Sequence, residues 1–336
     1  MATEKTAILL LNIGTPDSPQ VKDVRRYLSE FLNDPKVIDI PWLMRKILVN
    51  LIIIPFRAPK SAKLYQQIWT LKGSPLLYYS ESLKNKLNNL MDDDNQVFLS
   101  MRYGNPSIKN TIRQIQNDGF TKIIAVPLFP QWASSSTQTA INAVQREIGK
   151  WETRPQLRMV NQFYHHPQFI DAFVHRIKEF DLTAYDHIIF SYHGLPIRHI
   201  QATHPENDCA TCACNNNMPT CGEYCYKATC YATTRLLAKE LGLTPNQYSQ
   251  GFQSRLSKKW ITPFTDEIIR TKGQEGVKNI LVIAPAFVTD CLETIIEIGI
   301  EYKELFKQHG GSSLDYVPSL NESDRWVNAL KNIIEI

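Results

Sequence analysis

The chain has 336 residues, of which 43% are hydrophobic and 21% are charged, a composition typical of a globular protein with a large core. Its length predicts about two domains. The 37 basic and 33 acidic residues leave a net charge of only +4, and no stretch interleaves aromatic with basic residues. Composition and charge therefore give no support to a nucleic-acid partner.

The N-terminus and the longest apolar segment bear on location. Met1 to Lys5 lead directly into an apolar run without a signal-peptide pattern, so we expect a cytoplasmic protein. The segment 47–56 is too short to span a bilayer, which needs about 20 apolar residues. It is either a buried helix with its exit loop or, over 42–56, an apolar lip that contacts a membrane surface peripherally or a greasy ligand. Its flanks are basic, at Arg45, Lys46, Arg57, Lys60 and Lys63.

Apolar runs that end at Gly or Pro alternate with segments of helical spacing along the chain. Strands are predicted over 6–13, 96–103, 122–129, 157–163, 186–190, 249–253 and 279–287. Helices are predicted over 21–32, 79–90, 107–117, 134–150, 167–180, 226–241, 263–272, 290–308 and 322–336. This alternation predicts an α/β fold with parallel sheets and right-handed crossovers.

An internal similarity divides the chain. The segment 119–129 resembles 276–287, because in both a helix ends at Gly and an apolar strand closes with Pro-x-Phe. We therefore expect two similar domains, over 1–155 and 156–320, the second with a cysteine-rich insert at 205–230, followed by a C-terminal helix over 321–336. No Gly-x-Gly-x-x-Gly follows the first strand, so nothing indicates dinucleotide binding.

His193 stands directly after the apolar run 186–190, and Gly194 and Pro196 end that run. It is therefore expected at the C-terminal end of a central strand, where open α/β sheets bind ligands. A neutral imidazole there can accept a proton or ligate a metal. The alternative is that His193 is a structural turn residue whose ring nitrogens hydrogen-bond to neighbouring residues.

An acidic series follows a later strand. Glu293, Glu297 and Glu301 are spaced i, i+4, i+8, which places them on one face of a helix beginning at a strand end. Such a series can conduct protons or a divalent cation. The alternative is a solvated helix face.

Other strand-end loops carry aromatic and hydroxyl side chains, which suit a flat, largely apolar ligand with a polar edge. They include the segment 131–137, Arg102, Tyr103 and Trp260. Arg102 can pair with a carboxylate of such a ligand.

Six of the seven cysteines lie between 209 and 230, which in a cytosolic chain indicates metal or redox chemistry. Four thiolates in so short a stretch fit a [2Fe–2S] cluster or a structural Zn²⁺, with free or disulfide-bonded cysteines as the third alternative. Cys225 and Cys230 flank the first turns of a helix, whose N-terminus favours thiolates. The candidate ligands are four of Cys209, Cys212, Cys214, Cys225 and Cys230, with Cys221 in reserve.

A set of motifs occurs in the order found in the ferrochelatase family, which the chain resembles over about residues 6–335. The motifs lie at 10–16, 73–75, 102–106, 130–134, 191–196, 253–254 and 289–294. The resemblance implies two Rossmann-like domains, each a parallel four-stranded sheet flanked by helices, with a porphyrin between them. It also implies insertion of Fe²⁺ into protoporphyrin IX with release of two protons, which forms protohaem in the last step of haem biosynthesis.

The resemblance also assigns residues. His193 and Glu293 match the family's catalytic pair, and the implied metal path runs over His193, Glu293, Glu297 and Glu301. Which of the pair takes the pyrrole protons stays open. Cys291 stands where many members have a second histidine, and Ile13 where some have a tyrosine. The implied porphyrin contacts are Ile13, Arg102, Tyr103, Gln131, Trp132, Ser134 and Trp260.

Some bacterial ferrochelatases resemble this chain in carrying an internal cysteine segment that holds a [2Fe–2S] cluster, which is therefore the expected cofactor, with a stabilising or sensing role. Two rival functions remain at this point, a cobalt-inserting tetrapyrrole chelatase and a non-enzymatic haem or iron sensor. Nothing in the sequence sets the oligomeric state.

Overall fold

The computed structural model describes residues 5–203, 208–209, 211–220 and 222–335. These fall into two compact units. The first unit comprises the described residues up to Phe129, Ser134–Gln162 and the C-terminal segment from Glu322. The second unit comprises Pro130–Ala133 and the described part of Phe163–Asn321.

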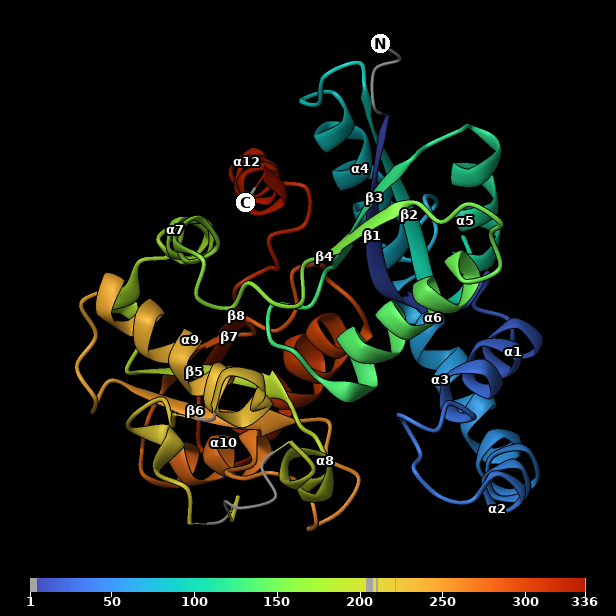
Figure 1. Ribbon diagram of the computed structural model, residues 1–336. Coiled ribbons are helices and arrows are strands. Elements are labelled where there is room, and N and C mark those ends of the chain that lie inside the picture. Colours follow the sequence, from blue (N-terminus) through green and yellow to red (C-terminus); the bar gives the residue numbers. More distant parts are fainter. Residues whose placement is uncertain (1–4, 204–207, 210, 221, 336) are drawn as a thin grey trace. The chain divides into compact units, whose positions relative to one another are not determined.

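The first unit is built on a parallel sheet with the strand order β2-β1-β3-β4 (Figure 1). Its strands are β1 (Thr6–Thr15), β2 (Asn95–Gly104), β3 (Lys122–Pro127) and β4 (Gln156–Met159). Its helices are α1 (Val21–Leu32), α2 (Trp42–Ile47), the π-helix η1 (Leu48–Ile53), α3 (Ile54–Ile68), α4 (Pro75–Asn88), α5 (Ile108–Asn117), the π-helix η2 (Ser134–Gln138), α6 (Thr139–Ile148) and α12 (Asp324–Glu335).

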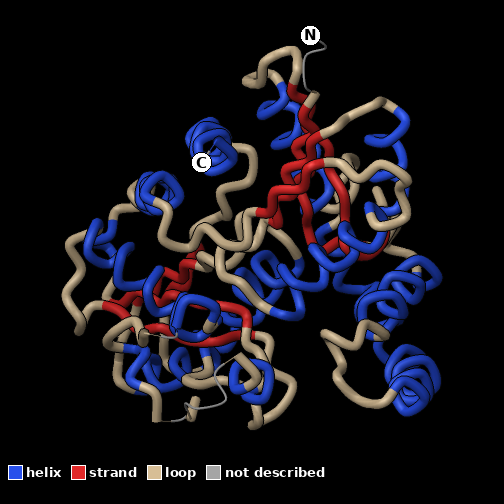
Figure 2. The backbone as a smooth tube through the Cα atoms, viewed as in Figure 1, coloured by secondary structure: helices blue, strands red, loops and turns tan. Residues whose placement is uncertain are grey.

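The second unit repeats the plan with the strand order β6-β5-β7-β8, again all parallel. Its strands are β5 (His187–His193), β6 (Tyr248–Gln253), β7 (Asn279–Ile283) and β8 (Ser313–Tyr316). Its helices are α7 (Pro167–Ile177), α8 (Ile197–Gln201), α9 (Tyr226–Glu240), α10 (Thr265–Gln274), the π-helix η6 (Glu293–Tyr302), α11 (Lys303–Gln308) and three short 3₁₀ turns, η3 (Leu182–Ala184), η4 (Ala213–Asn215) and η5 (Gly222–Tyr224). Figure 2 shows each sheet flanked by helices, so the predicted fold class is confirmed.

The central strands form because their side chains are apolar on both faces and are buried on both. Ala7 to Leu11 of β1 and Ile280 to Ile283 of β7 have at most 2% of their surface exposed. Helix side chains such as Ile112 and Ile298 complete the two cores. Continuous apolar runs of this kind characterise parallel strands covered by helices on either side.

Two elements belong to a different sheet or unit than their place in the sequence suggested. The strand expected over 157–163, at the start of the second half, is β4, and it pairs with β3 in the first sheet from Lys122↔Gln156 to Ala125↔Met159. The C-terminal helix α12 belongs to the first unit, where Lys86 of α4 lies 2.7 Å from Asp324. Strand β8 was not predicted, because its four residues have no apolar run.

Two of the predicted helices begin as π-helices. The helix expected over 134–150 begins with the π-helix η2, and the helix expected over 290–308 begins with the ten-residue π-helix η6. In a π-helix the backbone hydrogen bonds run from i to i+5, and such segments are frequent at functional sites. Hydrophobic spacing alone does not distinguish the two helix types.

The apolar segment 42–56 is exposed, so its interpretation as a buried helix is wrong for most of its side chains. Trp42, Leu51 and Phe56 expose 65%, 70% and 72% of their surface, whereas Val49 and Ile54 pack into the first unit. We call the exposed side chains of α2, η1 and the start of α3 the apolar lip; they are Trp42, Leu43, Met44, Ile47, Leu51, Ile52 and Phe56. Within the described residues, the helices are all too short or too polar to cross a bilayer.

Candidate active site

His193 is the last residue of β5, at the C-terminal edge of the second sheet, as predicted. The strands on either side end at the same edge, since β5 lies between β6 and β7. In the register of β5 and β6, His193 stands opposite Gln253. This edge is the position at which parallel sheets present ligand-binding residues.

The ring of His193 is held by a backbone group. Its Nδ1 lies 2.6 Å from the carbonyl oxygen of Gly194. A carbonyl oxygen only accepts, so Nδ1 carries the proton of this hydrogen bond. In the neutral imidazole the basic atom is then Nε2, which can accept a proton from a ligand.

Two aromatic rings flank the imidazole. The ring centroids of Trp260 and Phe287 each lie 6.3 Å from that of His193. Gly194 permits this packing, because a Cβ at that position would lie 2.8 Å from the carbonyl oxygen of Gln253 and 3.2 Å from Trp260. His193 is therefore half-buried beside two aromatic rings.

Gln253 connects His193 to the π-helix η6. Its backbone oxygen accepts a hydrogen bond from the Gly194 amide at 2.8 Å. Its side-chain Nε2 lies 3.4 Å from the carbonyl oxygen of Glu293 and 3.2 Å from Oε2 of Glu297. The turn that carries His193 and the helix that begins with Glu293 are thus tied to one residue.

Glu297 is fully committed to hydrogen bonds. Its Oε1 accepts from the Ser254 amide at 2.7 Å and from the Tyr302 hydroxyl at 2.8 Å. Its Oε2 accepts from the Ser254 hydroxyl at 2.5 Å and from Gln253. Burial, with the Glu297 carboxylate beside it, raises the pKa of Tyr302, which therefore stays a neutral donor. In this arrangement Glu297 fixes η6 to the end of β6 and has no oxygen lone pair left for a metal ion.

The other two carboxylates of the series differ in exposure. Glu293 is half-buried at the first position of η6, and the Cys291 thiol hydrogen-bonds to it. Burial, together with the charge of Glu293, raises the pKa of Cys291 well above its usual range, so the thiol is neutral. Glu301 is exposed, and partial burial with the charges of Glu297 and Glu304 raises its pKa.

Asp290 anchors the chain just before η6. It is buried, and its carboxylate accepts from the Thr294 hydroxyl at 3.0 Å, the Ser319 amide at 3.1 Å and the Asn321 side chain at 2.8 Å. Asn321 in turn accepts from the Asp290 amide at 2.8 Å. The start of the π-helix is thereby positioned by segments far apart in the sequence.

The predicted porphyrin contacts fall into three groups. Trp260 lies beside His193, and Trp132 is half-buried with its ring 5.8 Å from that of Tyr224 in the second unit. Ile13 and Ser134 are partly exposed in the first unit. Arg102, Tyr103 and Gln131 are engaged within the protein and form a third group.

The side chains of this third group bond to other residues of the protein, so their polar atoms are little available to a ligand. Tyr103 and Gln131 are buried, and Gln131 donates to Thr233 at 3.0 Å. The guanidinium of Arg102 contacts Asp34 at 2.5 Å and the Thr139 hydroxyl at 2.8 Å. Asp34 was not singled out from the sequence; the Asn-Asp-Pro turn at 33–35 was the available signal, because such turns hold an acid at a helix end.

Four of the candidate cluster cysteines gather around one small cavity of about 10 Å³, lined in part by Cys209, Cys212, Cys214 and Cys225. Burial raises the pKa of Cys214 to about 12 and that of Cys225 to about 11, and neighbouring thiols contribute to both shifts. Cys225 is the N-cap of α9, where the Ala228 amide donates to its sulfur.

The remaining cysteines stand apart from that cavity. Cys230 is fully buried, one turn into α9, and does not line it. The reserve candidate Cys221 lies outside the described residues. All the described cysteines are free of disulfide bonds, and within the described ranges no three His, Cys, Asp or Glu side chains form a group that could hold a metal ion.

Solved structures share this fold. The chain matches SirB from Bacillus subtilis with Fe³⁺ at a TM-score of 0.58, with 12% identity over 98% of this chain and 94% of that chain. It matches the sirohydrochlorin chelatase SirB from Bacillus subtilis subspecies spizizenii, in complex with cobalt, at a TM-score of 0.54 with the same identity and coverage. The likeness to these two structures shows that the chain has the fold of the SirB proteins.

Sequence comparison narrows the class to one family. The model of the family described as Ferrochelatase matches residues 5–336. A curated ferrochelatase of Coxiella burnetii is 44% identical over 97% of this chain and 92% of its own length, and one of Legionella pneumophila is 42% identical over 98% of both. The chain belongs to the ferrochelatase family and is a metal chelatase, a lyase of haem biosynthesis.

The engagement of Glu297 gives a prediction about stability. In Glu297→Gln the amide group presents N–H donors to partners that are themselves donors, so we expect a loss of about 2 kcal/mol in the free energy of unfolding of the second unit. The exposed matched variant, Glu301→Gln, is expected to change it by less than about 0.5 kcal/mol. Urea denaturation followed by tryptophan fluorescence measures both. Equal effects of the two substitutions would show that the hydrogen bonds of Glu297 carry no special weight.

Proposed function

We propose that His193 and Glu293 form the reaction centre at which this ferrochelatase inserts Fe²⁺ into protoporphyrin IX. The observation that carries the proposal is that Gln253 bonds both to the turn of His193, whose Nε2 can accept a proton, and to Glu293 at the start of η6. Glu297 and Asp290 hold that helix in place. Fe²⁺ and protoporphyrin IX are the substrates, and protohaem and two protons are the products.

The chemistry assigns different work to the two groups. The macrocycle loses two pyrrole N–H protons as the metal enters, so a proton acceptor must lie close to the ring. Nε2 of His193 is that base in our proposal. A carboxylate is a suitable oxygen ligand for a hard divalent cation, and Glu293 delivers the iron, with the exposed Glu301 as the outer member of its path.

The residues around the imidazole suit a flat apolar ligand. Trp260 and Phe287 lie close to His193 and give it apolar neighbours. We propose that Trp260 packs against the macrocycle and that Trp132, Ile13 and Ser134 add contacts. Arg102 acts in our proposal through Asp34 and Thr139 and not as a free carboxylate receptor.

The reaction centre is tested by steady-state kinetics. His193→Ala is expected to lower kcat by about 100-fold to 10,000-fold, because it removes the proton acceptor. Glu293→Gln is expected to raise the KM for Fe²⁺ more than the KM for porphyrin, because it removes a metal ligand but leaves the base. Added imidazole is expected to restore part of the activity of His193→Ala and none of that of Glu293→Gln. Full turnover by His193→Ala would refute the proposal.

We further propose that the cysteine segment holds a [2Fe–2S] cluster. The donor set fits in kind and number, because four thiols converge on one cavity and one of them caps a helix N-terminus, where thiolates are stabilised. Lys227 lines the same cavity, and its charge lowers the pKa of Cys209 and of Cys214 against the effect of burial. When bound, such a cluster supplies redox-active iron and a covalent link between the segment 209–214 and α9.

The cluster is tested on the protein as purified without added oxidant. We expect a brown protein with about two irons and two sulfides per chain, the content of one [2Fe–2S] cluster. Cys225→Ser is expected to lose both, whereas Cys291→Ser, outside the segment, is expected to keep both. Loss of iron in Cys230→Ser but not in Cys212→Ser would replace Cys212 by Cys230 in the ligand set. A colourless protein with one zinc would refute the cluster.

Finally, we propose that the apolar lip makes peripheral contact with a membrane surface. Seven large apolar side chains exposed within one helical segment exceed what a water-facing surface ordinarily shows. Exposed basic residues flank them, including Lys46, Arg57 and Lys60, which suit a surface of anionic lipid.

Flotation with lipid vesicles tests the lip. The double variant Leu51→Ser with Phe56→Ser is expected to weaken binding to vesicles about 100-fold, because it removes the burial of two large apolar side chains. Leu71→Ser with Leu256→Ser is the matched control, since both residues are exposed leucines outside the lip. An equal loss in both double variants, or no loss in either, would contradict the role of the lip.

A further inference from the structure

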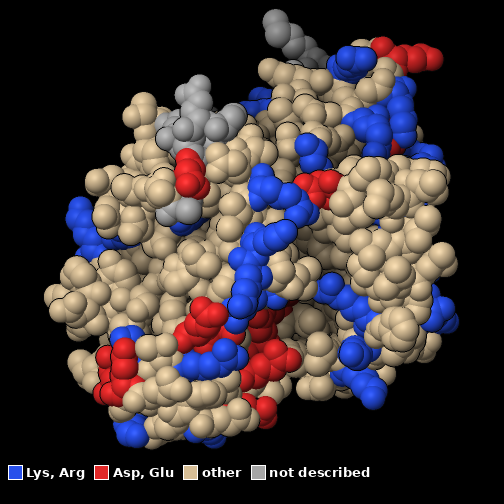
Figure 3. Space-filling view, turned by 90° about the horizontal axis from the view of Figure 1, so that it is seen from below, with Lys and Arg blue, Asp and Glu red and all other residues tan. Residues whose placement is uncertain are grey.

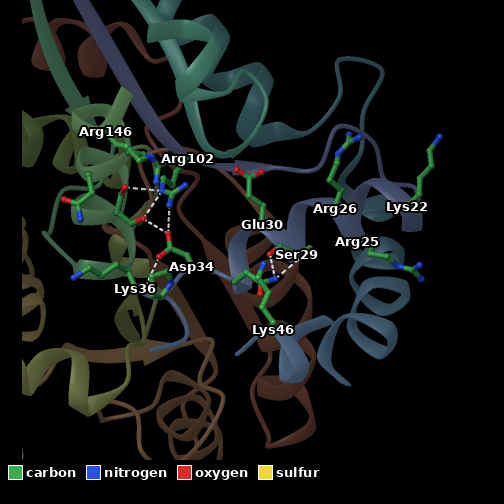
Figure 4. Close-up of a pocket in the computed structure, with 15 residues that line it drawn as sticks. Lys22, Arg25, Arg26, Ser29, Glu30, Asp34, Lys36, Lys46, Arg102 and Arg146 are labelled. Atoms are coloured by element: carbon green, nitrogen blue, oxygen red, sulfur yellow. Dashed lines mark hydrogen bonds and ion pairs between the residues drawn. The ribbon is translucent and has the colours of Figure 1, made fainter. Parts of the chain in front are cut away.

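A basic groove of about 850 Å³ lies in the first unit, and its lining includes neither His193 nor Glu293. Its walls are faces of two helices. Lys22, Arg25 and Arg26 on α1 follow the spacing i, i+3, i+4, and Thr139 and Arg146 on α6 are spaced i, i+7. Figure 4 shows these side chains together with Lys36 and Lys46, which come from the segment after α1 and from α2.

The lining is strongly positive. It holds seven Lys or Arg side chains and two carboxylates, a surplus of five positive charges in a chain whose whole net charge is +4. Figure 3 shows one face of the molecule, on which Lys and Arg side chains cluster in some places and Asp and Glu side chains in others. A hollow lined by one sign of charge concentrates the opposite sign from solution.

The acidic residue at the base of the groove does not offset this charge. Asp34 is buried and accepts hydrogen bonds from Thr139 at 2.6 Å, Tyr103 at 2.9 Å and Arg102. Although burial opposes it, these groups and the Lys36 backbone amide hold the pKa of Asp34 below its ordinary value. The negative charge of Asp34 is balanced by the positive charge of Arg102. The pair therefore adds no net charge to the lining of the groove.

The remaining cations differ in how they are paired. Arg26 contacts Asp17 and lies 3.4 Å from Asp23, and Arg146 lies 3.5 Å from Glu147. By contrast, Lys22, Arg25, Lys36 and Lys46 make no ion pair within the part of the chain that the structure describes. Glu30 accepts a hydrogen bond from the Gly104 amide at 3.0 Å and is the remaining carboxylate in the lining. Four positive charges in one hollow are therefore without a counter-charge from the described residues.

Size and composition indicate the ligand. The volume is that of a small-molecule site and exceeds what a single inorganic ion fills. The lining contains no aromatic side chain, so it offers no stacking surface for a porphyrin or a nucleobase. Arg and Lys together with hydroxyl and amide groups are the usual partners of phosphate.

We propose that the basic groove binds a phosphate-bearing anion without an aromatic ring. Two sources supply this chemistry, a free phosphate compound and the headgroup of an anionic phospholipid. The phospholipid headgroup is supported by the connection between the groove and the apolar lip. Asn50 of η1 accepts hydrogen bonds from Ser29 and Asn33 in the groove wall, and Lys46 of the groove directly precedes the exposed Ile47 of the lip. The site is independent of the reaction centre.

Two double variants test the site, Lys22→Gln with Arg25→Gln on one wall and Lys36→Gln with Lys46→Gln on the other. The matched control is Lys109→Gln with Arg113→Gln, which removes the same charge from the exposed face of α5 in the same unit. The first arm titrates inorganic pyrophosphate and sn-glycerol 3-phosphate by calorimetry. The second arm measures flotation with phosphatidylglycerol vesicles against phosphatidylcholine vesicles.

We expect each groove variant to weaken phosphate binding by at least about tenfold and the control to leave it unchanged. Loss in the calorimetric arm alone identifies a free phosphate compound as the ligand, and loss in the vesicle arm alone identifies the lipid headgroup. Equal losses in the control and the groove variants, or no loss in either arm, would overturn the proposal. The lip variant with Leu51 and Phe56 replaced keeps the groove intact, so its pyrophosphate binding separates failure of the lip from failure of the site.

Discussion

The hydrogen bonds of Glu297 are the constraint on which the candidate active site depends. This one half-buried carboxylate accepts from the end of β6 and from Tyr302 on its own helix, and it thereby fixes a π-helix against the sheet edge. A carboxylate bonded in this way is costly to disturb, because each partner would be left without an acceptor in a half-buried place. Glu293, the first residue of this π-helix, is positioned by these hydrogen bonds. Gln253 bonds both to Glu293 and to the turn that holds His193.

The site divides the labour of the reaction between residues that touch substrate and residues that hold them. His193 and Glu293 are the groups we propose to act on the porphyrin and the metal, whereas Glu297 and Asp290 position the helix between them. Within the acidic series, the middle member Glu297 already accepts four hydrogen bonds, and we propose that it supports the helix and does not bind the metal. The separation follows from coordination capacity, since an oxygen that already accepts two hydrogen bonds is a poor metal ligand.

The first unit contributes different chemistry. Its strand-end arginine is neutralised by Asp34, yet the surrounding helices carry cations without a described counter-charge. The apolar lip is joined to the same helices through Asn50, so an apolar surface and a basic groove belong to one continuous piece of structure.

The sequence by itself determined the two parallel sheets, the place of His193 at a strand end and the gathering of cysteines, because each follows from local pattern: apolar runs closed by Gly or Pro, and ligands close together in the chain. It could not assign β4 to the first sheet or α12 to the first unit, since pairing partners are chosen by packing between distant segments. Nor did it reveal the π-helix, the engagement of Glu297 or the Asp34–Arg102 pair. Those depend on which side chains meet across the fold, and hydrogen bonds between residues 43 or 68 positions apart leave no trace in local spacing.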